Sequence, residues 1–353
     1  MKSDHQHDSS ADTECTTAGG LGRREFLCRC GGIAAMATGL AAINRPALAG
    51  TTTFKATHGA GLCNLAIFLA HKRKTAEKFG VHLEFVNAPT TADVATIFGS
   101  GQVDISSVPY TNFFTLVDKG APVKIVAGTG VEGCIIVAKP GIDSADKLKG
   151  KTLATFQADT LEVLPYDWLK SKGVDWNDVD IRFMGSSPEL AQAFINGAVD
   201  AICHIEPYAT QALNAVEGAV MLSDGTDIYK PYYTDCVIAA SERAINENRE
   251  AMKGLIKSLM ISQLESEMDR VSALKDTVGT YYKTDLETIK AASTSQFLMI
   301  DQRSNEQFMI ERSKSVAELG YIKKPVDESV FDWSLMEEVI AEDPNLYRKL
   351  VVV

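Results

Sequence analysis

Short apolar runs alternate with amphipathic stretches along most of the chain. This alternation is typical of α/β units built around a mainly parallel sheet. The first set of elements ends at 139–141, where Lys-Pro-Gly interrupts the pattern. In this set the pattern predicts strands at 53–57, 81–86, 103–106, 123–129 and 133–138, and helices at 64–79, 92–99 and 111–119.

A second and similar set of elements follows this break. Its predicted strands are 152–155, 179–184, 201–204 and 237–240, and its predicted helices are 160–172, 188–196 and 207–216. From residue 244 onward the chain is predicted to be mostly helical, because apolar residues recur at three- and four-residue spacing within 252–268.

Two phrases recur at equivalent places in the two sets. Gly-Ser-Gly-Gln-Val-Asp-Ile at 99–105 matches Asn-Gly-Ala-Val-Asp-Ala-Ile at 196–202, and each leads from a helix end into a buried strand. Segments 132–138 and 235–240 each hold an acid, a cysteine and an apolar strand, where one set gives way to the other. Two α/β units joined by two crossing strands predict a hinged, two-lobed protein. The predicted lobes are 50–137 plus 238–353 (lobe I) and 138–237 (lobe II).

The first 49 residues have the pattern of a twin-arginine export signal. A long polar stretch is followed by an arginine pair, a Gly/Ala-rich apolar stretch at 30–43 and a small-x-small cleavage pattern. The residues that carry the signal are Arg23, Arg24, Phe26, Leu27, Ala47 and Ala49. The apolar stretch is too short to anchor a helix, and the cysteines at 28 and 30 precede it, so they form no lipoprotein box. We expect the twin-arginine machinery to deliver a periplasmic protein without a lipid anchor. A chance arginine pair before a buried helix is the alternative.

Composition and charge exclude some partners. Hydrophobic residues make up 45% and charged residues 23% of the chain, which is ordinary for a soluble globular protein. The formal net charge is -11 and no basic stripe offsets it, which argues against nucleic acid and against an anionic membrane surface. We expect a monomer.

Several segments resemble the solute-binding proteins of ABC importers for aliphatic sulfonates, taurine, nitrate and the thiamine pyrimidine precursor. The matching segments are 70–85, 99–104, 119–126 (Lys-Gly-Ala-Pro-Val-Lys-Ile-Val), 144–151 (Ser-Ala-Asp-Lys-Leu-Lys-Gly-Lys) and 199–208 (Val-Asp-Ala-Ile-Cys-His-Ile-Glu-Pro-Tyr). The resemblance implies a periplasmic type II binding fold, with two mainly parallel sheets, a two-strand hinge and a helical C-terminus. It implies a small-molecule ligand held between the lobes, an ABC permease in the inner membrane as partner, no cofactor and no catalysis.

Ligand sites in such folds lie at the carboxyl ends of strands, where helix N-termini point their N–H groups inward. Here those edges are rich in Ser, Thr and Gly and hold carboxylates but no Arg or Lys. The carboxylates favour an amine-bearing or neutral ligand, although backbone N–H groups could hold a sulfonate or nitrate. Glu206 is expected to contact a positive part of the ligand, with a structural pairing as the alternative. The candidate ligand-binding residues are His58, Cys63, Asn64, Thr90, Thr91, Ser107, Tyr110, Thr129, Glu132, Asp159, Thr160, Ser187, His204, Glu206, Tyr208 and Asp235.

The cysteines leave two questions open. Cys134 and Cys236 hold equivalent places on the crossing strands, so they are either a disulfide or a pair of buried free thiols. Four residues at edges of opposite lobes could compose a soft-metal site on closure: His58, Cys63, Cys203 and His204. Small buried hydrophobes are the alternative for those cysteines.

The sequence bears on two rival function classes, an enzyme and a sensor. A thiamine-pyrimidine-synthase-like enzyme would carry a cysteine-rich iron motif, which this sequence lacks, as it lacks a nucleophile elbow, a phosphate loop and an H-E-x-x-H helix. An extracytoplasmic sensor would share every feature named above and stays open.

Overall fold

The first of two five-stranded sheets has the order β2-β1-β3-β11-β4 in this computed structural model, which describes residues 50–350 except for the side chain of Thr91. Its strands are β1 (Thr52–His58), β2 (Val81–Phe85), β3 (Ile105–Pro109), β4 (Val123–Gly128) and β11 (Cys236–Ser241). Strands β1, β2 and β3 are parallel, and β11 runs antiparallel to β3 and β4. The residues of the predicted export signal lie outside the described range.

The second sheet has the order β10-β6-β9-β7-β8. Its strands are β6 (Cys134–Ala138), β7 (Thr152–Thr155), β8 (Asp180–Phe183), β9 (Ala201–Ile205) and β10 (Val220–Ser223). Strand β7 is parallel to β8 and β9, whereas β6 is antiparallel to β9 and β10. The helices that follow these strands are α4 (Thr160–Ser171), α5 (Ser187–Ile195) and α6 (Tyr208–Ala215).

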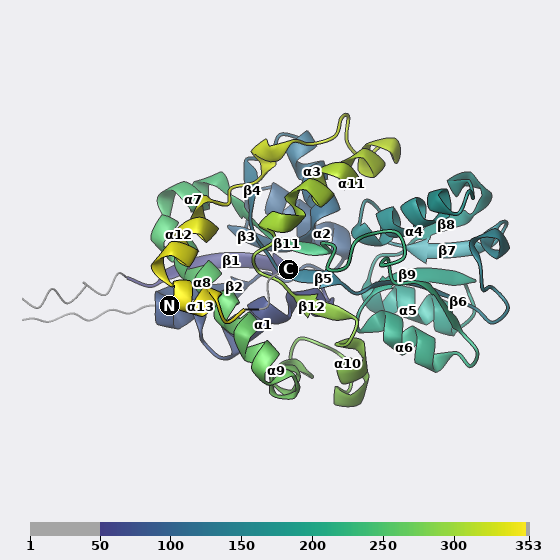
Figure 1. Ribbon diagram of the computed structural model, residues 1–353, viewed down its shortest axis with the longest axis horizontal. Coiled ribbons are helices and arrows are strands. Elements are labelled where there is room, and N and C mark those ends of the chain that lie inside the picture. The colour runs from purple at the N-terminus through teal and green to yellow at the C-terminus, as the bar shows by residue number, and fades with distance from the viewer. Residues whose placement is uncertain (1–49, 351–353) are drawn as a thin grey trace, which may run out of the picture. The chain divides into compact units, whose positions relative to one another are not determined.

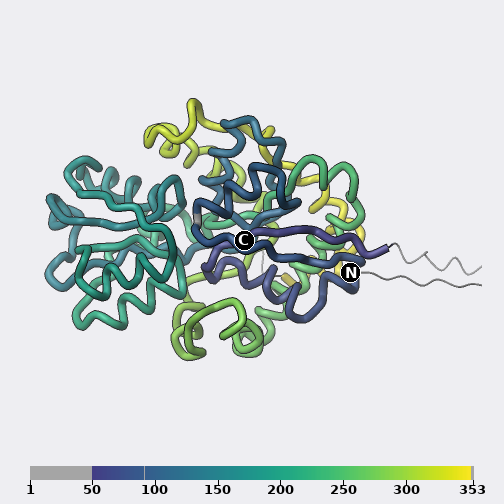
Figure 2. The backbone as a smooth tube through the Cα atoms, turned by 180° about the vertical axis from the view of Figure 1, so that it is seen from behind, coloured from purple at the N-terminus to yellow at the C-terminus, as the bar shows by residue number. Residues whose placement is uncertain are grey.

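The remaining helices belong to the N-terminal and C-terminal parts of the chain. They are α1 (Leu65–Lys72), α2 (Thr91–Gly99), α3 (Tyr110–Asp118), α7 (Glu242–Glu247), α8 (Arg249–Met268), α9 (Arg270–Thr277), α10 (Leu286–Ala292), α11 (Glu306–Glu318), α12 (Ser334–Glu342) and α13 (Pro344–Tyr347). Short 3₁₀ helices lie at η1 (Leu62–Asn64), η2 (Ala76–Phe79), η3 (Ala145–Leu148), η4 (Trp176–Asp178), η5 (Arg303–Asn305) and η6 (Glu328–Val330). Figure 2 shows the middle of the chain gathered in one lobe, while both ends of the described chain build the other.

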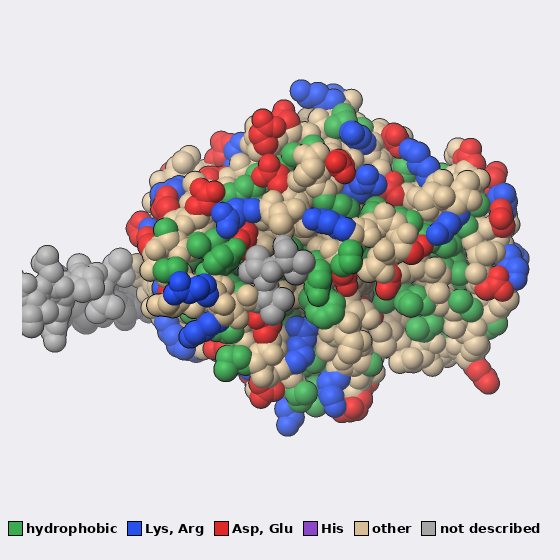
Figure 3. All heavy atoms as spheres, in the orientation of Figure 1, with side chains coloured by type: hydrophobic (Ala, Val, Ile, Leu, Met, Phe, Trp, Pro, Cys, Tyr) green, Lys and Arg blue, Asp and Glu red, His purple; other side chains and the backbone are tan. Residues whose placement is uncertain are grey.

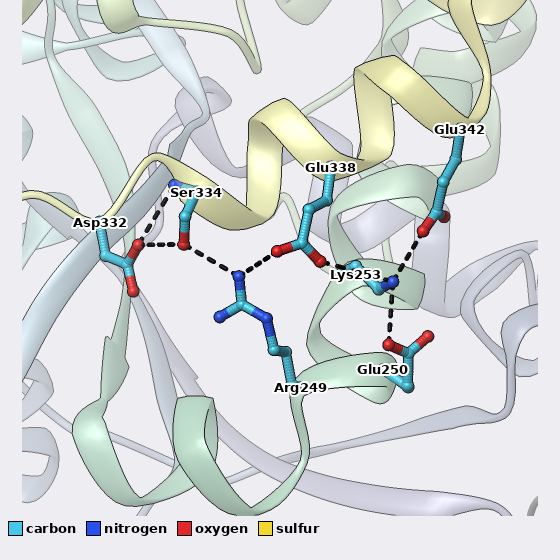
Figure 4. Close-up of polar contacts among 7 residues, drawn as sticks. All are labelled: Arg249, Glu250, Lys253, Asp332, Ser334, Glu338 and Glu342. Atoms are coloured by element: carbon cyan, nitrogen blue, oxygen red, sulfur yellow. Dashed lines mark hydrogen bonds and ion pairs between the residues drawn. The ribbon is translucent and has the colours of Figure 1, made fainter.

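The C-terminal helices complete the core of the first lobe. Met252, Leu255 and Leu259 on one side of α8 are fully buried in the cluster that contains Phe54 of β1 and Phe68 of α1. Polar contacts hold α12 over α8: Arg249 pairs with Glu338, and Lys253 lies 2.7 Å from Glu342 (Figure 4). The predicted helical C-terminus is therefore a structural part of lobe I.

The chain crosses between the lobes at two places. After β4 it passes through β5 (Gly130–Glu132), which pairs with β12 (Gln296–Leu298) in a small antiparallel sheet near the middle of the molecule (Figure 1). It returns between β10 and β11. Because β6 already belongs to the second sheet and β11 starts at Cys236 in the first, both crossings lie a few residues before the boundaries that we predicted. The two lobes pack as one compact unit.

The α/β class and the two mainly parallel sheets are confirmed, but several elements differ from the sequence prediction. The single helix predicted at 64–79 is divided into α1 and η2, because the chain leaves the helical conformation at Lys74, whose φ is 55°, and η1 directly precedes α1. Strand β3 extends to Pro109, beyond the predicted 103–106. Strands β5, β10 and β12, of three or four residues each, were not predicted.

None of the helices between residues 50 and 350 combines the length and the apolar character that a bilayer crossing requires. Figure 3 shows acidic and basic side chains interspersed over one face, with hydrophobic side chains in small scattered groups. That face therefore presents no field of a single sign.

Candidate functional site

A cavity of about 40 Å³ lies where the edges of the two sheets meet. Lobe I contributes the segment after β1 and the end of β3, and lobe II contributes the segments after β7 and β9. Six predicted ligand-binding residues line the cavity: Cys63, Asn64, Ser107, Asp159, Ser187 and Asp235. Cys236 also lines it, a residue that the sequence indicated only as a disulfide partner or a buried free thiol. The position is the one expected for ligands of open α/β sheets.

Asp235 is the polar centre of the cavity wall. It is 2% exposed and directly precedes β11. Its Oδ1 accepts hydrogen bonds from the hydroxyl of Thr160 (2.8 Å) and the thiol of Cys134 (3.4 Å). Its Oδ2 accepts one from Nε2 of Gln296 (3.1 Å). Burial raises the pKa of Asp235, and the hydrogen bonds from Thr160 and Cys134 partly oppose that shift.

Asp159 is a second buried carboxyl group beside the first. As the N-cap of α4 it accepts a hydrogen bond from the backbone N–H of Leu161 (3.1 Å). Burial raises the pKa of Asp159 to about 7; the Leu161 hydrogen bond opposes this shift and the charge of Asp235 adds to it. Described residues that line the cavity include no Lys or Arg. The two carboxyl groups therefore face the cavity without a cationic partner from the lining.

Thr160 connects the two carboxyl groups. Its hydroxyl oxygen lies 2.8 Å from Oδ1 of Asp235 and 3.1 Å from Oδ1 of Asp159. A hydroxyl carries one proton, so it donates to one carboxylate at a time. The second contact is a hydrogen bond only if that carboxyl group is protonated and donates to Thr160. A positive charge in the cavity would let both groups ionise.

The thiols surround the same carboxylate. All four cysteines of the described range are free, so the disulfide that the sequence left open between Cys134 and Cys236 is not formed. The thiol of Cys63 lies 3.1 Å from the sulfur of Cys236 instead. Burial raises the pKa of Cys134 and of Cys236, which keeps them neutral thiols at neutral pH.

Two polar atoms of the lining have no hydrogen-bond partner within the described residues. They are Oδ1 of Asn64 and Oγ of Ser107, whose residues are each 1% exposed. The amide of Asn64 is oriented by its Nδ2 group, which donates to the carbonyl of Gly61 at 3.0 Å. An unpaired buried acceptor is unfavourable, so a hydrogen-bond donor bound in the cavity would be stabilised by Oδ1 of Asn64.

His58 and Thr90 line an adjoining pocket, together with Ser187. Nδ1 of His58 lies 2.9 Å from the carbonyl of Gly59, and the ring packs edge-on against Phe68 at 4.7 Å between centroids. Thr90 caps α2 by accepting a hydrogen bond from the N–H of Asp93. His58 and Thr90 thus have structural partners and lie beside the cavity, in the lining of the adjoining pocket.

Four further predicted residues do not line this cavity, and three of them contact other residues of the protein. Tyr110 is buried in an aromatic cluster with Phe114, and Tyr208 stacks on His204 with centroids 5.1 Å apart. Glu132 accepts a hydrogen bond of 2.5 Å from the N–H of Tyr232. Thr129 is fully buried and its hydroxyl has no partner within the described residues.

Glu206 has a structural partner and is not among the cavity-lining residues. The side chain is fully buried, and it accepts hydrogen bonds from the backbone N–H (3.0 Å) and the hydroxyl (2.7 Å) of Thr210 in the first turns of α6. Burial raises its pKa to about 7, and these two hydrogen bonds oppose the shift. The sequence placed Glu206 at the strand-to-helix edge but could not show that its carboxylate turns back onto its own helix.

The four residues of the predicted soft-metal site do not converge. Cys203 lies in the hydrophobic core of lobe II. Both ring nitrogens of His204 are engaged, since Nδ1 accepts from the N–H of Ile205 (2.8 Å) and Nε2 lies 2.9 Å from the carbonyl of Ser187. Cys63 instead meets Asp235 and Cys236, with one ligand atom of each lying within 4.8 Å of the others. The recurring acid-cysteine phrase at 235–236 was the sequence feature that could have indicated this group.

The fold and the family match known binding proteins. Residues 58–273 match the NMT1-like family. A Brachyspira hyodysenteriae protein named as an ABC transporter periplasmic binding protein is 23% identical over 248 residues, which cover 66% of this chain and 70% of that protein.

Three solved structures show the same architecture at low sequence identity. The ligand-binding component of an ABC-type import system from Staphylococcus aureus, solved with zinc bound, has a TM-score of 0.71 at 15% identity and covers 82% of this chain and 99% of its own. The aliphatic sulphonate binding protein SsuA from Escherichia coli has a TM-score of 0.67 at 17% identity, with coverages of 80% and 97%. The nitrate-binding protein NrtA from Synechocystis PCC 6803 has a TM-score of 0.70 at 16% identity, with coverages of 85% and 91%. The chain belongs to the NMT1-like family and has the two-lobed fold of the solute-binding proteins of ABC importers.

Proposed function

We propose that the protein is the periplasmic solute-binding component of an ABC importer, which captures a small solute between its lobes and delivers it to a permease in the inner membrane. The observation that carries this proposal is the cavity between the lobes, whose wall combines buried carboxyl groups from both sides of the cleft. The negative charge of buried carboxylates must be neutralised by a bound cation or by protonation. The family match and the relative's name support the transport role.

The chemistry of the wall supports a positively charged or hydrogen-donating solute. Asp159 and Asp235 face the cavity with no Lys or Arg in the described lining, and Asn64 offers an unpaired oxygen. A sulfonate or nitrate, which the named relatives SsuA and NrtA bind, would meet two carboxyl groups at this place. We therefore propose that this chain has departed from those proteins in ligand charge. Taurine or an aminopyrimidine would satisfy the wall only through its amino group.

The proposed route to the periplasm is twin-arginine export followed by release without a lipid anchor. Its support is the arginine pair and the small-x-small pattern of the first 49 residues. The periplasmic relative is consistent with this destination.

A thermal-shift screen tests the binding role. The purified protein is melted in the presence of amines, aminopyrimidines, sulfonates, nitrate and transition-metal ions, because a solute that binds only the folded state raises the melting temperature. Deletion of the gene in the producing organism should then abolish uptake of the solute that stabilises the protein, and a wild-type copy should restore it. Unchanged uptake after deletion would contradict the proposed function.

A further inference from the structure

Three atoms that could bind a metal ion lie together in the wall of the interlobe cavity. The sulfur atoms of Cys63 and Cys236 are 3.1 Å apart, and a carboxylate oxygen of Asp235 lies within 4.8 Å of both. All three residues are buried, and all three line the cavity. Zn²⁺ binds both cysteine sulfurs and carboxylate oxygens in proteins, and Cu⁺ binds the sulfurs.

We propose that Cys63, Cys236 and Asp235 bind a thiophilic metal cation, Zn²⁺ or Cu⁺, and that this ion is the solute that the protein captures. The inference rests on the proposed function and narrows its substrate class. Binding releases the two thiol protons, and any proton on Asp235, to solvent and forms two metal–sulfur bonds and one metal–oxygen bond; no electrons are transferred. A position on the ion remains open toward the cavity, as in sites that exchange their ligand.

The distances are close to those that a bound ion requires. Tetrahedral metal–sulfur bonds of about 2.3 Å place two sulfurs roughly 3.8 Å apart. The two thiols would therefore move apart by only a fraction of an ångström from the 3.1 Å seen here. Cys63 is also held in place by its neighbours: a Cβ atom at Gly130 would lie 2.3 Å from that of Cys63, so only glycine fits there.

The residues around these three atoms orient them as partners of metal ligands do. Asp235 is fixed by Thr160, Cys134 and Gln296 through the hydrogen bonds described above. Nδ2 of Asn64 points at the sulfur of Cys63 from 3.4 Å, a contact that favours a thiolate over a thiol. These contacts place a donor beside one sulfur and leave the carboxylate with lone pairs to spare.

A second observation points to the same small cation. Oδ1 of Asn64 is 1% exposed, lines the cavity and has no hydrogen-bond partner within the described residues. A water molecule bound to the ion would donate to it. The cavity of about 40 Å³ has room for an ion with one or two waters, and the adjoining pocket that shares Ser187 with it measures about 170 Å³. Thiols are weak acceptors, so an ammonium ligand would leave Cys63 and Cys236 without a role.

The positions of these residues also link ion binding to the closure of lobe II onto lobe I. Cys63 and Cys236 belong to lobe I, and Thr160, at the start of α4 in lobe II, donates to the same Asp235 that would bind the ion. An ion that lands on the thiols of lobe I would then be covered by α4 and Asp159 when lobe II approaches.

The test uses the full protein purified after export, reduced under anaerobic conditions and stripped with a chelator. Zn²⁺ and Cu⁺ are titrated in competition with chromophoric chelators, and Co²⁺ serves as a spectroscopic probe through its thiolate charge-transfer bands. We expect one ion per chain. Loss of outer-shell partners of metal ligands typically changes affinity 10–100-fold, so Cys63→Ala and Cys236→Ala should each weaken binding by roughly a hundredfold or more. Asp235→Asn tests whether the Asp235 carboxylate is the third ligand, in which case this variant also binds the ion more weakly.

Cys203→Ala is the matched control, because Cys203 is equally buried but lies in the core of lobe II. The metal affinity of this variant should stay within a factor of about three of the wild-type value. Thermal melting should show that every variant is folded. The inference would be overturned if less than one ion bound per chain, or if all variants had equal metal affinities. It would also be overturned if mass spectrometry found a Cys63–Cys236 disulfide in the exported protein. If no metal ion binds but an amine or sulfonate binds and makes the protein more compact, the metal inference is wrong and the proposed function is still supported.

Discussion

Arg312 of α11 and Asp167 of α4 form an ion pair of 2.8 Å that ties the C-terminal helices to lobe II. The side chain of Asp167 is 7% exposed, and its carboxylate also accepts hydrogen bonds from the hydroxyls of Tyr229 and Ser315, each at 2.6 Å. All three donors come from outside α4. Because Thr160 at the start of the same helix contacts Asp235, the position of α4 links this ion pair to the ligand cavity.

Arg312→Met should loosen this connection while it keeps the apolar stem of the side chain. Breaking a buried pair leaves an uncompensated charge, and Arg312 is partly exposed, so we expect a loss of roughly 1–3 kcal/mol in the free energy of unfolding. Small-angle scattering of the unliganded variant should show a larger radius of gyration. Lys170→Met is the control, because its pair with Glu318 is well exposed and should contribute under about 1 kcal/mol. Equal losses in the two variants would contradict this role of Arg312.

Lys253 should stabilise the packing of α12 on α8. Its side chain is 10% exposed and lies near three carboxylates, at 2.7 Å from Glu342, 2.9 Å from Glu250 and 3.6 Å from Glu338 (Figure 4). Those carboxylates are largely exposed, so we expect Lys253→Met to lower the free energy of unfolding by only about 1–2 kcal/mol, and by less at high salt. Lys74→Met, which removes an exposed pair with Glu77, should change it by under about 0.5 kcal/mol. Urea denaturation at two salt concentrations measures both.

Export should depend on the arginine pair of the first 49 residues. Replacing Arg23 and Arg24 by Lys keeps the charge but removes the guanidinium groups that the twin-arginine machinery is expected to recognise. The precursor should then accumulate in the cytoplasm, while the wild-type protein is recovered from the periplasm with an N-terminus near Gly50. Cell fractionation and N-terminal sequencing follow both proteins. Normal export of the double variant would rule out this pathway.

The sequence predicted the architecture better than the site. Alternating patterns located nearly every long strand and helix, because burial of one face imposes a period on the residues. Six of the predicted edge residues line the cavity, since the carboxyl ends of parallel strands meet there. The sequence could not show which side chains turn inward. The thiol of Cys63 contacts that of Cys236 and not that of Cys203. Cys236 is brought there because β11 joins the first sheet between β3 and β4, and no local sequence pattern encodes this contact between distant segments.

Glu206 should affect the pH dependence of stability and leave ligand affinity unchanged. Its carboxylate accepts two hydrogen bonds from Thr210 and is fully buried, and its pKa is raised from 4.5 to about 7 by burial. The folded state therefore holds this proton more tightly than the unfolded state does. Below pH 4.5 the group is protonated in both states. Between pH 4.5 and about 7 the unfolded state releases the proton while the folded state keeps it, so the folded protein loses stability as pH rises; above about 7 both states are ionised and the loss stays constant.

Glu206→Gln removes that charge and keeps the shape, because the Gln oxygen can accept from the N–H of Thr210 while the Gln amide donates to the Thr210 hydroxyl. The difference in unfolding free energy between variant and wild type should grow in favour of the variant by up to about 3 kcal/mol between pH 4 and pH 8. Comparing the two proteins cancels the titration of Asp159 and Glu162, whose pKa values also lie at about 7. Urea denaturation across this pH range measures the difference, and calorimetry should give equal ligand affinities. A loss of affinity with no change in pH dependence would return Glu206 to the ligand site that the sequence first indicated.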